Sequence, residues 1–198
     1  MSLDPAVVLA LAARCAPGVA GETLLAVATA ESGLNPYAIG VNRAAPEPQP
    51  PQSHTEAVAV ARRRLSAGDD LDLGLAQINS ANLARLGLTL EAALDPCRNL
   101  AAAARVLAAD YGVAKTSAVG PQAALRTALS LYNTGDRTRG FRNGYVTRVV
   151  TAAASLKIPA PRRTPFPTSV RAPAWDAFGD LGAASFVIPT SSAQGATP

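Results

Sequence analysis

The chain has 198 residues, a net charge of +4 and an apolar content of 48%. These values exclude a globally disordered chain and allow one domain with a core plus an appendage. Aromatic residues make up only 5%, and the abundant alanine favours helices over a sheet core. The composition therefore predicts an all-α core.

Apolar residues at helical spacing, together with caps and breakers, predict a series of helices. In chain order they span residues 5–15, 21–32, 53–67, 80–86, 89–94, 96–111, 121–133 and 142–157. Asp4 before Pro5 is typical of an N-cap and the first helical residue, and Gly33 is typical of a helix end. Ser53 and Glu56 form a capping box at the start of the third helix.

Three segments lack helical periodicity. Residues 35–52 are predicted as a loop, because the prolines of APEPQPPQ exclude a helix or a central strand. Residues 69–79, with alternating leucines, are predicted to be extended or looped. From residue 159 the chain is rich in Pro, Ser, Thr and Ala. We therefore expect a folded domain at 1–158 and a largely disordered C-terminal tail at 159–198.

The tail has an unusual aromatic content. It contains the only tryptophan and three of the four phenylalanines, namely Phe166, Trp175, Phe178 and Phe186. Linkers rarely hold such residues, so they are candidates for contact with a partner protein or with the parent domain. The alternative is that they have no specific role.

The basic charge favours anionic partners such as nucleic acids, lipid headgroups or peptides rich in carboxylates. The one compact basic run, Arg62 to Arg64, is interpreted as a solvated helix face, and no nucleic-acid motif accompanies it. We therefore expect no direct nucleic-acid binding. No stretch approaches the ~20 apolar residues that span a bilayer. The N-terminus lacks the basic start of a signal peptide, so no export signal is evident.

Several kinds of chemistry are disfavoured by the residues present. His54 is the only histidine, which argues against histidine triads and histidine-rich metal sites. Neither a dinucleotide-binding nor a phosphate-cradling glycine motif occurs. The sequence implies no cofactor and no metal.

The two cysteines, Cys15 and Cys97, lie too far apart for a redox or metal motif. They are candidates for one disulfide between the first helix and a later one, which would imply an oxidising compartment. The alternative is two unrelated buried thiols.

Glu31 is the most informative residue. It ends a predicted helix and shares an apolar face with Val27 and Ala28, where a carboxylate is costly unless it is paired, protonated or functional. The C-terminal end of a helix also disfavours an anion, which raises the pKa of a carboxyl group there. A carboxylic acid with a raised pKa can protonate the leaving group of a glycosidic bond.

Four segments together resemble one known family. They are ESGLNPYAIG, LGLAQIN, DPCRNLAAAARVLAADY, and LYNTG followed by GYVTRVV. In these the chain resembles the soluble lytic transglycosylases, whose fold is similar to goose-type lysozyme. The resemblance covers roughly residues 5–157 and is greatest to the wall-cutting component of type IV secretion and conjugation systems.

The resemblance implies that Glu31 is the single catalytic acid and base and that Ser32 supports it. It implies that the other residues around the substrate are Gly74, Leu75, Gln77, Ile78, Tyr132, Asn133 and Tyr145. Two positions depart from the family pattern. Ala76 stands where methionine is frequent, and Leu131 stands where alanine usually precedes the tyrosine.

The resemblance further implies cleavage of peptidoglycan strands without water, giving a 1,6-anhydro sugar, in the periplasm or cell envelope. Ordinary glycosidases use two carboxylates, and Asp70, Asp72 and Asp136 are the candidates for a second one. A hydrolysing muramidase and a non-catalytic assembly factor that binds peptidoglycan therefore remain alternatives. The tail is a candidate for binding secretion subunits.

Overall fold

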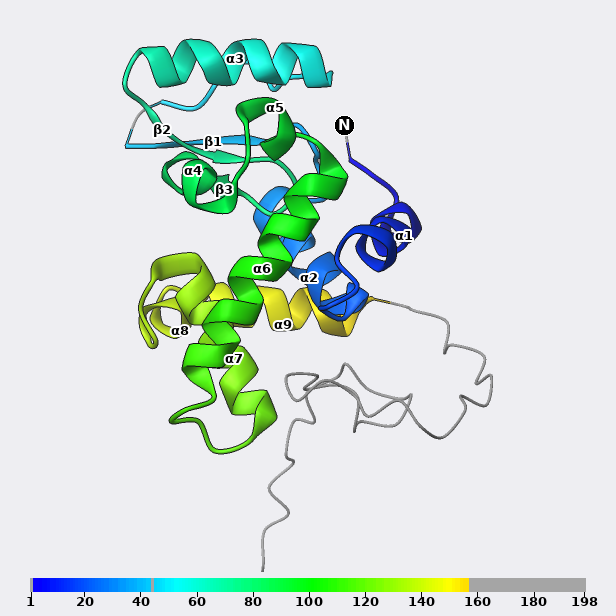
Figure 1. The fold of residues 1–198 in the computed structure, drawn as a ribbon, viewed down its shortest axis with the longest axis vertical. Helices are drawn as coiled ribbons and strands as arrows, with labels where there is room; N and C mark the ends of the chain where they lie inside the picture. Colours follow the sequence, from blue (N-terminus) through cyan, green and yellow to red (C-terminus); the bar gives the residue numbers. More distant parts are fainter. Residues whose placement is uncertain (1, 44, 157–198) are drawn as a thin grey trace, which may run out of the picture.

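Helices dominate residues 2–43 and 45–156, the parts of the chain that the computed structural model describes (Figure 1). The helices are α1 Pro5–Cys15, α2 Gly21–Ser32, α3 His54–Ser66, α4 Leu83–Leu86, α5 Leu90–Ala93, α6 Pro96–Ala114, α7 Pro121–Thr134, α8 Arg139–Arg142 and α9 Tyr145–Ser155. A 3-10 turn, η1 Ser80–Asn82, precedes α4. The predicted helical, lysozyme-like fold class is confirmed. The predicted tail, 159–198, lies outside the described residues.

The predicted helix starts are capped by the expected side chains. Asp4 accepts a hydrogen bond from the backbone N–H of Ala6 at 2.8 Å, and Ser53 accepts one from Glu56 at 3.2 Å. Gly33 ends α2 in the left-handed conformation, with φ of 59°. These local interactions explain why α1 and α3 begin, and α2 ends, close to the predicted positions.

A small antiparallel sheet adds to the helices. It consists of β1 Ile39–Asn42, β2 Asp70–Leu73 and β3 Ile78–Asn79, in the order β1-β2-β3. The prediction of a loop at 35–52 was therefore wrong for β1. Four residues are too few to show a strand pattern, and β1 is specified by its pairing with β2, which is distant in the sequence.

The last predicted helix, 142–157, starts too early: α9 begins at Tyr145, and Arg142 is the last residue of the short helix α8. Gly144 adopts a φ of 78°, which separates α8 from α9. A helix cannot continue through a left-handed residue, so the chain turns here and α9 begins at Tyr145. This turn decides where Tyr145 points.

The core has two parts, which lie on either side of the turn at Gly74. In the larger part, α2 packs against α1 and α9, while α6 packs against α1 and α7 (Figure 1). The smaller part lies between the sheet and helices α3 and α5 and includes Ala57, Ala61, Leu71, Leu73 and Leu94. Leu73 and Leu75 flank the turn at Gly74 and are fully buried, one in each part.

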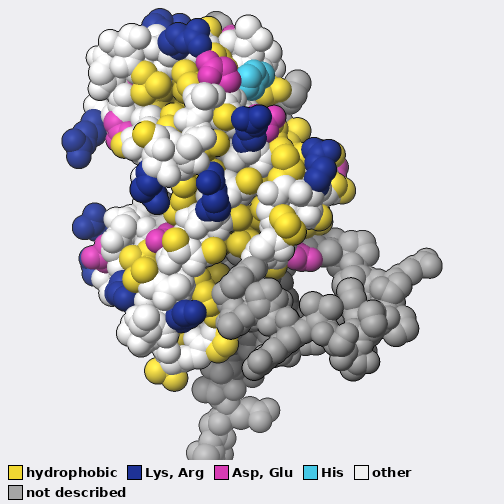
Figure 2. Space-filling view, in the orientation of Figure 1, with side chains coloured by type: hydrophobic (Ala, Val, Ile, Leu, Met, Phe, Trp, Pro, Cys, Tyr) yellow, Lys and Arg dark blue, Asp and Glu magenta, His cyan; other side chains and the backbone are white. Residues whose placement is uncertain are grey.

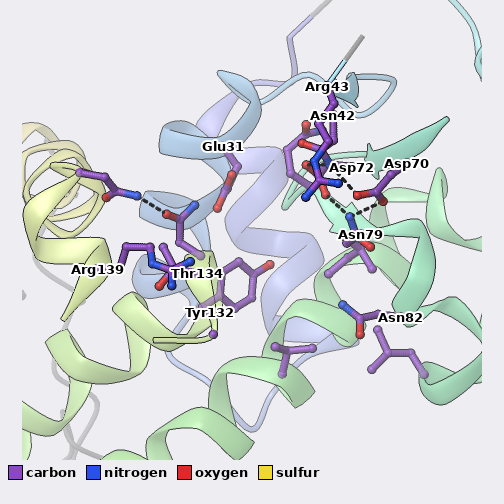
Figure 3. A pocket seen from close by; sticks show the side chains of 17 residues that line it. Glu31, Asn42, Arg43, Asp70, Asp72, Asn79, Asn82, Tyr132, Thr134 and Arg139 are labelled. Atoms are coloured by element: carbon purple, nitrogen blue, oxygen red, sulfur yellow. Dashed lines mark hydrogen bonds between the residues drawn. The ribbon is translucent and has the colours of Figure 1, made fainter. Parts of the chain in front are cut away.

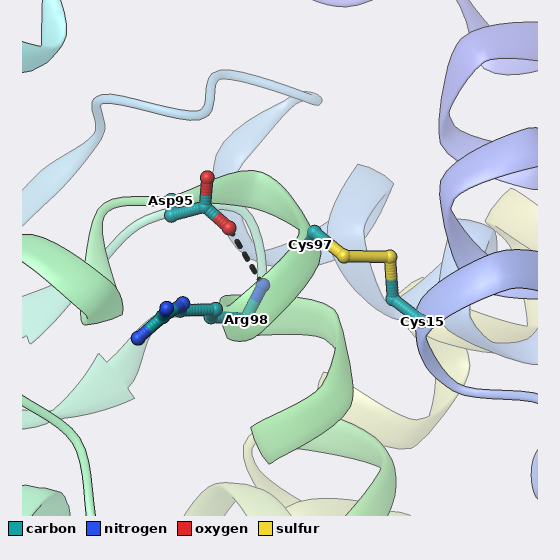
Figure 4. The surroundings of a disulfide bond; sticks show 4 residues. All are labelled: Cys15, Asp95, Cys97 and Arg98. Carbon is teal, nitrogen blue, oxygen red and sulfur yellow. Dashed lines mark hydrogen bonds between the residues drawn. A yellow bond between two sulfur atoms is a disulfide. The ribbon is translucent and has the colours of Figure 1, made fainter.

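A disulfide joins Cys15, at the end of α1, to Cys97, in the first turn of α6 (Figure 4). The two Cα atoms are 5.5 Å apart, and 82 positions separate the cysteines in the sequence. A cross-link that closes a loop of this length restricts the unfolded chain and is worth about 4 kcal/mol in the chain-entropy model. It fixes the start of α6, the helix that carries Asn99.

None of the helices in the described part of the chain is both long enough and apolar enough to cross a membrane.

Candidate active site

A cleft of about 710 Å³ opens between the sheet and the α7–α8 region (Figures 2 and 3). The sheet side contributes Asn42, Arg43, Asp70, Asp72, Asn79 and Asn82. The opposite side contributes Asn133, Thr134, Gly135, Arg139 and Asn143. Glu31, Gln77, Ile78, Leu86, Val106 and Tyr132 complete the lining. Because amides, hydroxyls and charges dominate these walls, the cleft suits a polar, extended ligand such as a sugar chain.

Glu31 points from the end of α2 into the space between the two walls (Figure 3). Its pKa rises from the ordinary 4.5 to about 7, chiefly because burial removes water from the carboxylate. The negative charge of Asp72 raises the pKa further, whereas Tyr145 and Arg148 lower it. A carboxyl group with this pKa can both donate and accept a proton near neutral pH.

Tyr145, the first residue of α9, interacts with Glu31 and is almost fully buried. Its hydroxyl favours the ionised form of Glu31 but forms no well-aligned hydrogen bond with any residue of the described structure. Burial raises the pKa of Tyr145 far above its ordinary range, so the hydroxyl keeps its proton. The Arg148 guanidinium lies 5.6 Å from the centre of the Tyr145 ring and brings a positive charge near Glu31.

Two hydroxyl groups tie the helices to the turn at 74–77. The Ser32 hydroxyl donates to the carbonyl of Leu75 at 2.7 Å and also approaches that of Ala28 at 3.1 Å. The Tyr132 hydroxyl donates to the carbonyl of Ala76 at 2.7 Å. Ser32 thus links the end of α2, next to Glu31, to the same turn that α7 holds from the other side.

The buried side chain of Asn99 organises that turn from within. Its Oδ1 accepts a hydrogen bond from the backbone N–H of Ala76 at 2.8 Å, and its Nδ2 donates to the carbonyls of Leu73 and Ala93 at 2.8 and 2.7 Å. Asn99 is fully buried, and its amide approaches Gly74 so closely that a Cβ at Gly74 would lie 2.6 Å from Nδ2. Only glycine fits there, with φ of 75°.

Sequence reasoning did not identify Asn99. A signal was present, because an asparagine at the end of the first turn of an alanine-rich helix is a poor helix former and a costly residue to bury. Its three partners lie in segments distant from α6 or before its start, so the sequence alone did not show what would satisfy it.

The two candidate carboxylates of β2 face the cleft side by side (Figure 3). Asn79 donates to Asp70 at 2.8 Å and to Asp72 at 2.9 Å, and Asn42 donates to Asp72 at 3.0 Å. The sheet register causes this, because Asn42 pairs with Asp70 and Asn79 with Asp72. Asp72 is the carboxylate that raises the pKa of Glu31.

Asp136, the third candidate, has a different role. Its carboxylate accepts hydrogen bonds from the backbone N–H groups of Thr138 and Arg139 at 2.8 and 2.7 Å, which lower its pKa to about 2. Asp136 does not belong to the cleft lining. It shapes the turn before α8, so it is unsuited to act opposite Glu31.

The model of the transglycosylase SLT domain family matches residues 9–151. The chain belongs to this family. It is 49% identical to "Protein virB1" of Rhizobium radiobacter over 150 residues, which are 76% of this chain and 62% of the relative. It is 40% identical to "Type IV secretion system protein virB1" of Brucella suis over 168 residues, or 79% of this chain and 70% of the relative.

The chain thus spans about three-fifths of the length of two virB1 proteins to which it is 49% identical. No solved structure matches the chain.

The residues implied by the family resemblance occupy distinct places. Glu31, Gln77, Ile78, Tyr132 and Asn133 line the cleft. Gly74 and Leu75 lie behind it and shape the turn. The backbone of Gln77 is in the left-handed region, with φ of 49°, and its side-chain amide donates to the carbonyl of Gly74 at 2.9 Å.

His54 lies outside the cleft lining, with Nε2 2.9 Å from the carbonyl oxygen of Glu91. Within residues 2–43 and 45–156 no group of three or more His, Cys, Asp or Glu side chains could hold a metal ion.

The raised pKa of Glu31 predicts a stability effect that is independent of catalysis. Between pH 4.5 and about 7 the unfolded chain releases the Glu31 proton while the folded protein retains it, so stability falls as pH rises. Glu31→Gln removes this titration. We expect it to change little near pH 4 and to stabilise the fold by up to about 3 kcal/mol above pH 7.

Urea unfolding followed by circular dichroism at pH 4 and pH 8 measures this effect. Glu22→Gln, at the other end of α2, is the matched control and should gain no stability at the higher pH. Equal effects of Glu31→Gln at both pH values would contradict the raised pKa.

The Asn99 network predicts a large cost for a nearly isosteric change. Asn99→Asp keeps an acceptor for Ala76 but places a carboxylate against the buried carbonyls of Leu73 and Ala93. We expect a loss of about 2–4 kcal/mol, since two buried acceptors lose their donor. Urea unfolding of the variant beside Asn82→Asp, whose side chain is only partly buried, measures it. A loss below about 1 kcal/mol would show that Asn99 does not hold the turn.

Proposed function

We propose that this chain is a peptidoglycan lytic transglycosylase. It cleaves the β-1,4 bond between N-acetylmuramic acid (MurNAc) and N-acetylglucosamine (GlcNAc) and forms 1,6-anhydro-MurNAc. The observation that carries the proposal is the position of Glu31, whose carboxyl has a pKa of about 7 and faces an open polar cleft. Membership of the SLT family supports the same conclusion.

Glu31 serves twice in the proposed reaction. The protonated carboxyl first donates its proton to the glycosidic oxygen, the C1–O bond breaks, and GlcNAc leaves with a free 4-hydroxyl. Positive charge develops at C1 of MurNAc. The Glu31 carboxylate then accepts the proton of the 6-hydroxyl as O6 bonds to C1. Glu31 ends protonated, as it began, and no water is consumed.

The surroundings of Glu31 suit this cycle. Burial and Asp72 favour the protonated form that starts the reaction, while Tyr145 and Arg148 favour the carboxylate formed in the middle. The opposing influences keep the pKa near neutrality, where one group can act in both directions. Tyr132 and Asn133 line the cleft, which supports the proposal that they contact the sugar.

The virB1 relatives support a role beside a type IV secretion apparatus. We propose that the enzyme acts in the periplasm and opens the cell wall locally, so that a complex spanning the envelope can assemble. The disulfide between Cys15 and Cys97 is consistent with that oxidising compartment.

A muramidase that hydrolyses the same bond is the second candidate. The observation in its favour is Asp72, a carboxylate that lines the cleft with Glu31 and interacts with it electrostatically. Two carboxylates on either side of a sugar chain are the usual arrangement for hydrolysis. The bonds from Asn42 and Asn79 hold Asp72 in place for such a role.

Mass spectrometry of the fragments released from purified peptidoglycan separates these candidates. The transglycosylase releases anhydro-muropeptides, and Glu31→Gln releases none while keeping its fold. Asp72→Asn should retain most of the transglycosylase activity, with a profile shifted to lower pH because the pKa of Glu31 falls.

Reducing-end products, heavier by one water, that disappear in Asp72→Asn would replace the proposal with a muramidase. Absence of products from folded protein would favour a non-catalytic assembly factor that binds peptidoglycan.

We propose that the aromatic residues of the segment 159–198 bind subunits of the secretion apparatus. Deleting the chain after Lys157 should leave cleavage of purified peptidoglycan unchanged and reduce copurification with the subunits. Four alanine substitutions at Phe166, Trp175, Phe178 and Phe186 in the full chain should reproduce the loss. Unchanged copurification of both variants would overturn this proposal.

A further inference from the structure

The two walls of the cleft differ in charge. The sheet wall carries Asp70 and Asp72 beside Arg43, whereas the only charged residue in the lining of the opposite wall, as far as the structure describes it, is Arg139. The sequence continues this asymmetry, since residues 137–156 include four arginines and no Asp or Glu. Figure 2 shows Lys and Arg side chains on both sides of the hollow. An anionic group on a bound chain would be favoured at the α8 wall.

Arg139 differs from the other arginines of this segment. The guanidinium of Arg137 donates to Ser117 and Val113, that of Arg142 to Thr138, and that of Arg148 to the carbonyl of Asn143. Among the described residues, the Arg139 guanidinium donates no hydrogen bond and forms no salt bridge. Its five donors are therefore available to a ligand.

The backbone of Arg139 is held firmly even though its side chain is exposed. Its N–H donates to Asp136 at 2.7 Å, and the N–H of Gly140 donates to the buried hydroxyl of Ser130 at 2.9 Å. Gly140 is packed so tightly that a Cβ would lie 2.6 Å from the Cα of Ser130. A donor on a fixed backbone loses less conformational freedom on binding than one on a mobile loop.

The positive charge of Arg139 is not used by the catalytic group. Arg148, rather than Arg139, is the cation that lowers the pKa of Glu31. The charge of Arg139 contributes to the lowered pKa of Asp136. The Asp136 carboxylate, however, is bound mainly by backbone N–H groups and by the Thr138 hydroxyl. An arginine that contacts only solvent needs no fixed backbone on a cleft wall, so the position of Arg139 favours a role in binding.

We propose that Arg139 forms a carboxylate-binding subsite for the group that MurNAc carries on its lactyl ether. The inference rests on the proposed function, which places peptidoglycan in the cleft. MurNAc is the sugar that bears anionic groups: the carboxylates of its peptide stem or, where the stem has been removed, the lactyl carboxylate. A guanidinium matches a carboxylate with two parallel hydrogen bonds, so Arg139 selects strands by this charge.

Binding of soluble, uncross-linked glycan strands to the full chain with Glu31→Gln tests the proposal without any need for cleavage. Three strand preparations are compared: with intact stems, with all carboxylates converted to amides, and with stems removed so that the lactyl carboxylate is free. Adding Arg139→Gln should weaken binding of strands with free carboxylates about tenfold and leave binding of amidated strands unchanged.

The preparations also distinguish the two sources of the carboxylate. A loss confined to intact strands assigns the subsite to the carboxylates of the peptide stem, and a loss confined to stripped strands assigns it to the lactyl carboxylate. Equal losses on both preparations show that Arg139 accepts either carboxylate. Arg142→Gln is the matched control, because it removes one positive charge from α8 outside the cleft lining. It should change binding less than twofold on every preparation, because salt screens the effect of an exposed charge outside the cleft.

Three results would overturn the subsite. They are an affinity of Arg139→Gln that is unchanged for both intact and stripped strands, an equal loss on amidated strands, and an equal loss in Arg142→Gln. Circular dichroism and urea unfolding establish that the variants are folded. The proposed function fails separately: if no glycan is cleaved but binding depends on Arg139 and on carboxylates, the subsite stands and the transglycosylase does not.

Discussion

The buried amide of Asn99 makes three hydrogen bonds on which the geometry of the cleft depends. They fix the turn at 74–77 against α6 and the end of α5. Through that turn, Ser32 anchors the end of the helix that carries Glu31, and Tyr132 anchors α7. The network is fully inside the protein, so a missing partner would leave unpaired polar groups in a low-dielectric region. The disulfide at Cys97 holds the same turn of α6 against α1.

The electrostatics of Glu31 follow from opposing contributions that come from different elements. Desolvation between α2 and the rest of the core is the largest and raises the pKa. Asp72 from β2 adds to it, and Tyr145 and Arg148 from α9 oppose it. No single neighbour sets the protonation state. The pKa of Glu31 therefore depends on the sheet and on α9 together. The site forms only when the whole domain is folded.

Much of the fold was predictable where the signal is local. Asp4, Gly33 and Ser53 act on backbone groups within five residues of themselves, and the helix ends that they set appear at the predicted positions. The strand at Ile39–Asn42 and the break at Gly144 were missed. The first depends on pairing with residues about thirty positions away, and the second on a backbone conformation that glycine permits but does not require.

By itself the sequence determined the helical class, the starts of α1, α3 and α6, the end of α2, and the identity of Glu31 as a carboxyl in a costly position. The four motifs that it carries also determined the family. Only the tertiary structure decided that Asp72 faces the cleft while Asp136 shapes a turn, that Asn99 holds the turn at 74–77, and that the Arg139 guanidinium has no hydrogen-bond partner among the described residues. Those assignments depend on which groups lie within hydrogen-bond distance after the chain has folded, and such distances are set by packing between segments far apart in the sequence.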